Sequence, residues 1–568
     1  MPSNDLQLTA HQQEALRRIK DFLDHSNDDV FVLKGYAGTG KTTLINYILD
    51  ELGKRNKDYK LAAPTGRAVR VLSEKLNMKK AAYPFFLLVQ DGLLVDTAPL
   101  DEFMAETINT VHGHIYTPLG VNYNDEETKV SDTERNLFNA SLLDFIDNIR
   151  AHKNIIIPDN IRRKLKEDHN NYKLFFGILQ YDQSIVVIVD EASMIADHSQ
   201  QEETSQAIFG TGRLLSDLFT AFPKGRFIFI GDDAQLPPVG SSHSVALDAR
   251  YMEEEHGKSV QTYEMTEIVR AYRHNDIIKA ATMLRLQIND RKKPPKFYLA
   301  GLQNLVHLPI QRNLEVYLQK IDNALKHHGL EKGLFQALRQ NILITLTNKK
   351  VHAFNRFIRQ HIFGANTPEL QLYDILMVTQ NQVTSDLNNG DFVQVIALGP
   401  QTRKADLHFR EIKVRRLSDD RSFSTLIIED ILGSDYSNIS HVQYKELMRD
   451  LIIRLAQAGK FKNKNDEERQ QIIMEATKDD PYINALRAIH GYTVTCHKAQ
   501  GGEWDEVHIL IDKIIYGNSF RRPYNWVYTA LTRAKHYAYI SSEAKVEPFG
   551  KVEAFLCERY PELCHDKH

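Results

Sequence analysis

Cysteine is scarce in this sequence, and long hydrophobic runs are missing. Only 3 cysteines occur among 568 residues, too few for the disulfide framework of a small secreted protein. No apolar run reaches the roughly 18 residues that a membrane-spanning helix needs. The N-terminus has neither the basic segment nor the apolar core of a secretory signal. We therefore expect a cytoplasmic protein that does not bind membranes.

An excess of positive charge is also missing. The formal net charge is -3, so the chain lacks the overall basic field that attracts nucleic acid nonspecifically. Two local basic clusters exist, at residues 291–296 and 410–416. Such clusters, taken alone, are more often solvated faces than binding sites. Any polyanion must therefore be bound in a local cleft.

A glycine-rich loop joins a strand pattern to a helix pattern near the N-terminus. An apolar run enters the sequence GYAGTGKT at residues 35–42, and apolar residues at helical spacing follow it. In such a loop, backbone N–H groups converge on phosphate at a helix N-terminus, the lysine reaches the β- and γ-phosphates, and the next hydroxyl binds Mg²⁺. The predicted nucleotide-binding residues are Gly35, Gly38, Thr39, Gly40, Lys41, Thr42 and Thr43, with Thr42 as a Mg²⁺ ligand.

Two later strand patterns end in polar residues. The run SIVVIVDEAS reads as a buried parallel strand with Asp190 and Glu191 at its carboxyl end. Asp190 is the expected Mg²⁺ ligand, and Glu191 is expected to orient and deprotonate the attacking water. In GRFIFIGDDAQLPPVG, Gln235 is placed to contact the γ-phosphate or that water, and its alternative role is a turn residue. Together, these patterns predict ATP hydrolysis.

The order of these motifs resembles that of superfamily 1 helicases, and more narrowly the RecD/Dda branch called 1B. The resemblance covers nearly the whole chain. Beyond the phosphate loop and the DEAS sequence, the matching segments are residues 61–75, 231–240, 265–273, 342–359, 388–393, 495–505 and 525–540. One departure is Ala271, where the family usually has glutamine after its arginine.

The resemblance implies an α/β fold of two RecA-like P-loop motor domains with parallel sheets, a small wedge insertion and an SH3-like β-barrel insertion. A chain of this length has room for about three to five domains. The expected division is 1–78, 185–255 for the first motor, 79–184 for insertions that include the wedge, 256–391 and 484–568 for the second motor, and 392–483 for the barrel. The sequence PFFLL at 84–88 is read as a buried strand rather than a wedge tip.

The resemblance also implies roles for residues around the nucleotide. Arg270 and Arg533 match the arginine fingers, which stabilise charge on the transferred phosphoryl group. Gln12 matches the adenine-reading element, although an ordinary polar position in an amphipathic helix is the alternative. The remaining expected nucleotide contacts are Gln500, Gly501 and Glu503.

DNA contacts are expected from loops opposite the nucleotide. Cys496 and His497 have no second pair at metal-ligand spacing, so we expect a coupling loop here rather than a zinc site. His112 is one expected backbone contact, with Asn109 as the alternative in another alignment. The full predicted set is Pro64, Thr65, His112, Asn348, His497 and Lys498.

The function implied by the resemblance is a Mg²⁺- and ATP-dependent DNA helicase that moves 5′-to-3′ on single-stranded DNA and unwinds duplex DNA at junctions. A monomer acting in DNA repair, recombination or replication is expected. Two alternatives stay open. One is a motor subunit of a multi-protein recombination or nuclease complex, and the other is a helicase directed to RNA.

Overall fold

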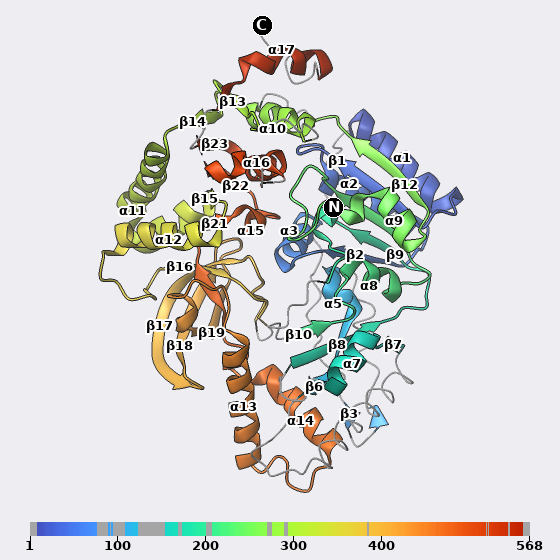
Figure 1. Ribbon diagram of the computed structural model, residues 1–568, viewed down its shortest axis with the longest axis vertical. Helices are drawn as coiled ribbons and strands as arrows, with labels where there is room; N and C mark the ends of the chain where they lie inside the picture. Colours follow the sequence, from blue (N-terminus) through green and yellow to red (C-terminus); the bar gives the residue numbers. More distant parts are fainter. Residues whose placement is uncertain are drawn as a thin grey trace.

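The computed structural model describes most of the chain (Figure 1). The described residues are 8–76, 89–90, 93–94, 108–122, 154–167, 173–199, 207–269, 275–288, 294–382, 385–517, 520, 522–542 and 546–560. The predicted strand at 84–88 lies outside them. None of the helices in these ranges is both long and apolar enough to cross a lipid bilayer.

The first large sheet has six parallel strands in the order β12-β1-β11-β9-β2-β5. Their bounds are Val260–Met265, Val30–Gly35, Arg226–Gly231, Val186–Val189, Tyr59–Ala63 and Ile108–Thr110. β1, β9 and β11 are almost wholly buried, as expected for strands covered on both faces. The continuous β-branched and aromatic runs in the sequence therefore mark the centre of this sheet.

Alternate side chains of these strands enter two separate cores. Phe31 and Leu33 pack with α1 (Ala10–His25), α2 (Lys41–Lys54) and α3 (Gly66–Leu76). Val30 and Val32 face the opposite side. That side is covered by α5 (Val111–Ile115), α8 (Leu214–Ala221) and α9 (Ala249–His256). Because the sheet is fixed between two helical layers, the carboxyl ends of its strands form a rigid edge.

The second large sheet has five parallel strands in the order β14-β23-β22-β15-β21. Their bounds are Leu305–His307, Ala534–Ser542, Trp504–Ile511, Asn341–Thr345 and Thr493–Thr495. The accompanying helices are α10 (Asp276–Leu286), α11 (Ile310–Gln340, kinked at Gly329), α12 (Asn348–Phe363), α15 (Cys496–Ala499), α16 (Pro523–Leu531) and α17 (Gly550–Arg559). A short pair, β13 (Tyr298–Ala300) and β24 (Glu547–Pro548), lies beside α17 (Figure 1). Two RecA-like parallel sheets are thus confirmed.

Two smaller sheets flank the large ones. The first contains β10 (Ala207–Phe209), β8 (Lys173–Leu179) and β6 (Tyr116–Asn122), with β7 (Ile155–Ile156) paired to β8 and α7 (Asp159–Glu167) nearby. This is the region of the predicted wedge. A separate pair, β3 (Val89–Gln90) and β4 (Leu93–Leu94), lies in the same part of the chain.

The other small sheet is antiparallel, in the order β19-β18-β17-β16-β20. The strands span Ser422–Ile428, Leu407–Arg416, Phe392–Lys404, Ile375–Val378 and Ala488–His490. Its two edges are joined by Leu486, two residues before β20: the Leu486 N–H donates to Leu426 O of β19 (2.6 Å), and the Ile428 N–H of β19 donates to Leu486 O (3.2 Å). This closed sheet occupies the place where the sequence predicts an SH3-like barrel.

A helical arm, α13 (His441–Gln457) and α14 (Asp466–Asp479), extends from the closed sheet. α14 lies against β6, so the arm joins the two small sheets on the side away from α17 (Figure 1).

The sheets divide the chain differently from the predicted boundaries. β12 at 260–265 belongs to the first sheet, beyond the predicted end at 255. β5 lies within the predicted insertion at 79–184 but pairs with β2 of the first sheet. β10 lies within the predicted motor segment at 185–255 but pairs with β8 of the small sheet. β16 and β20 both lie outside 392–483 yet belong to the closed sheet. Local patterns predict a strand, but which sheet it joins depends on distant partners.

Candidate active site

The glycine-rich loop between β1 and α2 has the conformation that phosphate binding requires. Gly38 and Gly40 have φ values of 79° and 75°, which glycine adopts far more readily than other residues. Lys41 Nζ donates to Gly35 O (2.8 Å) and Tyr36 O (3.1 Å). The ammonium is therefore held over the loop at the N-terminus of α2, where the helix dipole also favours an anion.

Two carboxylates follow β9. Burial, and next the charge of Glu191, raise the pKa of Asp190 to about 7. Glu191 has a left-handed backbone (φ 52°, ψ 35°), and its N–H donates to Asp190 Oδ1 (2.9 Å). Among the described residues, no partner contacts the buried Glu191 Oε2. Strained backbone and an unsatisfied acceptor are typical of groups held for a ligand.

Thr42 and Asp190 fit a Mg²⁺ ion by their chemistry. Both offer hard oxygen donors, which Mg²⁺ prefers. A cation would also compensate the crowded negative charge that raises the pKa of Asp190. When bound, Mg²⁺ neutralises charge on the β- and γ-phosphates. The contribution of the chain is to hold these donors beside the loop that binds phosphate.

The loop after β11 is bound directly by the second large sheet and its helices. Thr529 Oγ1 of α16 accepts from the Leu236 N–H (2.8 Å), and Gln500 Nε2 donates to Leu236 O (2.9 Å). Asn525 Nδ2 of α16 donates to Ala234 O (2.9 Å). Three side chains thus join one loop of the first sheet to the second sheet.

Gln235 and Asp232 lie in this same loop. Gln235 is buried, and its Oε1 has no partner among the described residues. Asp232 accepts from Tyr528 Oη (2.5 Å) and forms an ion pair with Arg285. The Tyr528 hydroxyl also accepts from the Ala37 N–H of the phosphate loop (3.1 Å). The phosphate loop and the loop after β11 therefore share one contact from α16.

Arg533 follows α16 and is buried. Its guanidinium donates to Thr529 O (3.1 Å), Gly502 O (3.3 Å) and Thr532 Oγ1 (3.2 Å). Within the described part of the chain, none of these acceptors carries a charge. A buried cation without a counter-ion is costly, and a phosphate would compensate it. Arg270 and Ala271 lie outside the described residues.

Gln12 lies against the phosphate loop. It is the third residue of α1, in a capping box with Thr9, and its Oε1 accepts from the Thr9 N–H (2.9 Å). Its Nε2 donates to Thr39 O (3.0 Å). A contact between Gln12 and the nucleotide base stays a prediction. The hydrogen bond to Thr39 O places the Gln12 side chain against the phosphate loop, whereas an ordinary polar residue of an amphipathic helix would face solvent.

The segment after α15 contacts the first sheet's loop. The Gln500 amide is directed to Leu236 O, and Gly501 has a φ of 72°. Glu503 is exposed. The contact that the structure gives Gln500 is therefore to the loop after β11, and nucleotide contacts by these three residues stay predictions.

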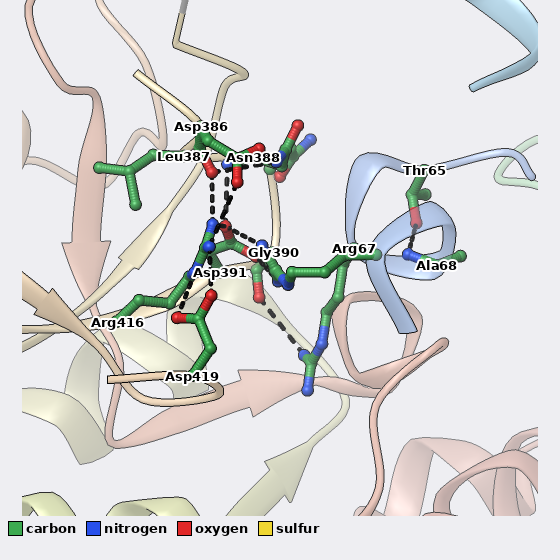
Figure 2. A network of polar contacts seen from close by, with 12 residues as sticks. Thr65, Arg67, Ala68, Asp386, Leu387, Asn388, Gly390, Asp391, Arg416 and Asp419 are labelled. Carbon is green, nitrogen blue, oxygen red and sulfur yellow. Dashed lines mark hydrogen bonds and ion pairs between the residues drawn. The ribbon is translucent and has the colours of Figure 1, made fainter. Parts of the chain in front are cut away.

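The predicted DNA contacts lie at helix starts. Thr65 Oγ1 accepts from the Ala68 N–H (3.2 Å), so it caps α3 directly after Pro64 (Figure 2). Asn348 is exposed at the first position of α12. Backbone N–H groups at such ends favour phosphate.

The side chains of His112 and Asn109, the two alternative DNA contacts, differ in solvent exposure. His112 is exposed on α5, with its ring centroid 5.4 Å from that of Tyr116 and 5.6 Å from that of Phe209. Asn109 is fully buried in β5, where its Oδ1 accepts from the Thr110 N–H (2.7 Å). Of the two alternatives, only His112 has a side chain that a strand can reach in this conformation.

His497 and Lys498 occupy α15, a single turn capped by Thr495. Burial lowers the pKa of His497 below its usual range and lowers the pKa of Lys498 to about 8. His497 is therefore neutral near pH 7 and would contact a strand by hydrogen bonding. Cys496 is fully buried, and its Sγ lies 3.5 Å from Trp526 O. Among the described residues, no group of three or more His, Cys, Asp or Glu side chains could hold a metal ion, which agrees with the absence of a zinc-type cluster around Cys496 and His497 in that part of the chain.

Replacing His497 with alanine should reduce strand-stimulated ATP hydrolysis more than basal hydrolysis. The reason is that α15 ends directly before Gln500, which binds the loop after β11, whereas no hydrogen bond among the described residues joins the His497 side chain to that loop. Steady-state ATPase rates with and without single-stranded DNA measure the difference. Equal loss of both rates would count against a DNA contact.

The fold and the site define the P-loop nucleoside triphosphatase class, with two RecA-like sheets joined at the loop after β11. Comparison with protein families agrees. Residues 20–241 match the family described as an AAA domain, and residues 490–541 match the UvrD-like helicase C-terminal domain. The first matched segment contains the phosphate loop and the second contains Arg533, and the second is a type of domain named for helicases.

Individual relatives are distant. Uncharacterized protein R530 of Acanthamoeba polyphaga mimivirus is 20% identical over 573 residues, covering 92% of this chain and 97% of that protein. A structure of Pif1 helicase from Bacteroides, in complex with ADP-AlF3 and ssDNA, is 15% identical with 98% coverage of each chain and a TM-score of 0.41. Pif1 helicase from Candida albicans is 13% identical, with 98% of this chain and 99% of that chain covered and a TM-score of 0.42.

Proposed function

We propose that this protein is an ATP-dependent helicase of superfamily 1, in the RecD/Dda branch, that moves 5′-to-3′ on single-stranded DNA and unwinds the duplex ahead of it. The observation that carries the proposal is the set of bonds from Gln500, Asn525 and Thr529 to the loop after β11. A change at the γ-phosphate would act on that loop and so reach the second motor directly. ATP turnover can thereby change the separation of the two motors.

The chemistry is assigned to four side chains, two of which, Glu191 and Gln235, have a buried oxygen with no hydrogen-bond partner among the described residues. The carboxylate of Glu191 would accept the proton of the attacking water, and Gln235 would orient that water or contact the γ-phosphate. Lys41 would move from its loop carbonyls to the phosphates. Arg533 would supply positive charge from the second motor as charge develops on the transferred group.

The strand would lie across both motors, opposite the nucleotide. Pro64, Thr65 and His112 would contact it from the first motor, and Asn348, His497 and Lys498 from the second. Contacts to the strand backbone give grip without base specificity, and stacking adds roughly 1–3 kcal/mol per base. Alternating grip by the two motors during each cycle of ATP then produces directed movement.

Polarity can be tested with tailed duplexes. A DNA duplex with a 5′ single-stranded tail should open in the presence of ATP and Mg²⁺, whereas one with only a 3′ tail should not. Gel separation of the strands measures the outcome. Opening of only the 3′-tailed duplex would overturn the branch assignment.

The same assay separates DNA from RNA as the track. Matched RNA tails of the same length should support less unwinding than DNA tails if DNA is the substrate. Preferential opening with RNA tails would support the RNA alternative. Loss of unwinding in the isolated chain, with retained ATPase activity, would support the alternative of a subunit that acts only in a complex.

A further inference from the structure

The N-terminal turn of α3 contacts the part of the molecule that contains the second large sheet and the closed sheet, which we call the second body. α3 follows Pro64 and Thr65 directly and belongs to the first sheet's helical layer. Two arginines of this helix, Arg67 and Arg70, nevertheless find their partners near residues 388–392. The closeness of approach is visible at Gly66, where a Cβ would meet Asn388 Cβ at 2.7 Å.

Arg70 forms a buried ion pair with Asp391. Its Nη1 donates to Asp391 Oδ2 (2.7 Å) and its Nη2 donates to Oδ1, so both carboxylate oxygens are bound. Asp391 is 1% exposed and Arg70 is 7% exposed. Such a two-point pair fixes orientation as well as distance. α3 is therefore held at a defined angle to the second body.

Asp391 also has partners in its own body. Arg416 Nη1 lies 3.4 Å from Asp391 Oδ2, and the Asn388 N–H donates to the same oxygen (2.9 Å) (Figure 2). Arg416 is further bound by Asp419, with 2.9 Å between Arg416 Nε and Asp419 Oδ1. If α3 moves away, Asp391 keeps a counter-ion. The pair with Arg70 can therefore break without leaving a buried carboxylate uncompensated.

Arg67 occupies a slot beside this pair. Its guanidinium carbon lies 5.3 Å from the centre of the Phe392 ring and 4.8 Å from that of Trp504, and its Nη1 donates to Gly390 O (3.3 Å) (Figure 2). Burial lowers the pKa of Arg67 to about 10, so it stays charged at neutral pH. A side chain at Gly502 would overlap the guanidinium. The slot therefore requires glycine at that position.

Gly502, which lies against the Arg67 guanidinium, also binds Arg533. Arg533 Nη1 donates to Gly502 O (3.3 Å). Gly502 therefore lies between two arginines: Arg67 packs against its Cα, and its carbonyl accepts from Arg533, the predicted arginine finger. The start of α3, with Pro64 and Thr65, is connected through Arg67 and Gly502 to Arg533 by direct contacts.

We propose that Arg67, Arg70 and Asp391, together the α3 latch, are positioning residues that tie the grip on the strand to the position of the arginine finger. The inference rests on the proposed function, since it takes Pro64 and Thr65 to contact DNA. The latch is formed when the motors are together and broken when α3 moves away. Its loss uncouples strand binding from finger placement while leaving each motor folded.

The test uses the full-length chain with Arg70→Ala. Because Asp391 keeps Arg416, this variant should melt close to the wild type and retain its basal ATPase rate. The concentration of single-stranded DNA for half-maximal ATPase stimulation should rise about tenfold, the upper part of the range for coupling between sites. Base pairs opened per ATP hydrolysed should fall as well.

Three companion variants sharpen the result. Arg70→Lys, which keeps the charge and loses the two-point geometry, should lie between the wild type and Arg70→Ala. Adding Arg70→Ala to Asp391→Asn should cause no further loss, because the two residues act as one unit. Arg17→Ala is the control, since Arg17 is exposed on α1 and pairs with Glu14 and Asp21 of its own helix.

Two outcomes would overturn the inference. Arg70→Ala could match the wild type in strand dependence and in base pairs opened per ATP. Alternatively, basal and stimulated rates could fall together at an unchanged half-maximal strand concentration, which would indicate a purely structural role. If no strand stimulates the wild-type ATPase, the proposed function fails instead.

Discussion

Lys41→Ala is expected to lower ATP hydrolysis by about a hundredfold or more and to abolish unwinding, since removal of one group that stabilises developing charge costs about that much. Among the described residues, Lys41 Nζ donates to Gly35 O and Tyr36 O. These are carbonyls of the loop itself, so the ammonium is free to transfer to phosphate. Phosphate release over time, at saturating ATP and DNA, measures the loss.

The fold should survive this substitution. Lys41 is only half-buried at the first position of α2, and the apolar residues that anchor the helix are Leu44, Ile45, Ile48 and Leu52. Circular dichroism melting should therefore match the wild type closely. Lys54→Ala is the matched control, because Lys54 lies in the last turn of the same helix with an exposed side chain. Retained hydrolysis in Lys41→Ala would show that the nucleotide binds elsewhere.

The arrangement of the segments that make up the predicted ATP site could be predicted from sequence because each segment is local. Eight consecutive residues at 35–42 form the phosphate loop, and Asp190 and Glu191 directly follow their strand. The carboxyl ends of parallel strands meet at one sheet edge, so three short segments were enough to predict one site. The neighbouring β1, β11 and β9 confirm that arrangement.

Contacts of the first motor with the second motor and the closed sheet could not be predicted from local sequence patterns. Arg70 and Asp391 are separated by 321 positions, and Leu236 and Thr529 by 293. No periodicity in either segment indicates its distant partner. The sequence APTGRAVR does contain Arg67 and Arg70, but arginines in an amphipathic helix are usually solvated. Their burial depends on the loop at 388–391 and on the absence of a side chain at Gly502.

Sheet membership was missed for a related reason. The predicted boundaries assigned the segments of β12 and β16 to the second motor. β12 pairs with β1 over six positions, and β16 pairs with β17 and β20. Hydrogen-bond partners across a sheet are not encoded in the alternation of one strand. Domain boundaries predicted from motifs are therefore least accurate where a strand joins a different sheet from the motif next to it in the sequence.

Arg533→Ala is expected to lower ATP hydrolysis by about a thousandfold, the lower end of the effect of an arginine finger. Arg533 already lies buried next to Gly502, with neutral acceptors from Thr529 and Thr532. A phosphate arriving at the site would meet a preformed cation whose desolvation is complete before the reaction begins. ATP affinity should change much less than turnover, because the charge is needed most as the phosphoryl group transfers.

The separation of turnover from binding is what distinguishes a finger from a structural arginine. Arg533→Lys should recover little activity, since an ammonium cannot reproduce the guanidinium's hydrogen bonds to two carbonyls. Lys535→Ala, at an exposed cation two residues further along β23, is the control. If Arg533→Ala weakens ATP binding and turnover in equal proportion, Arg533 contributes to ground-state binding, and Arg270 is then the remaining predicted arginine finger.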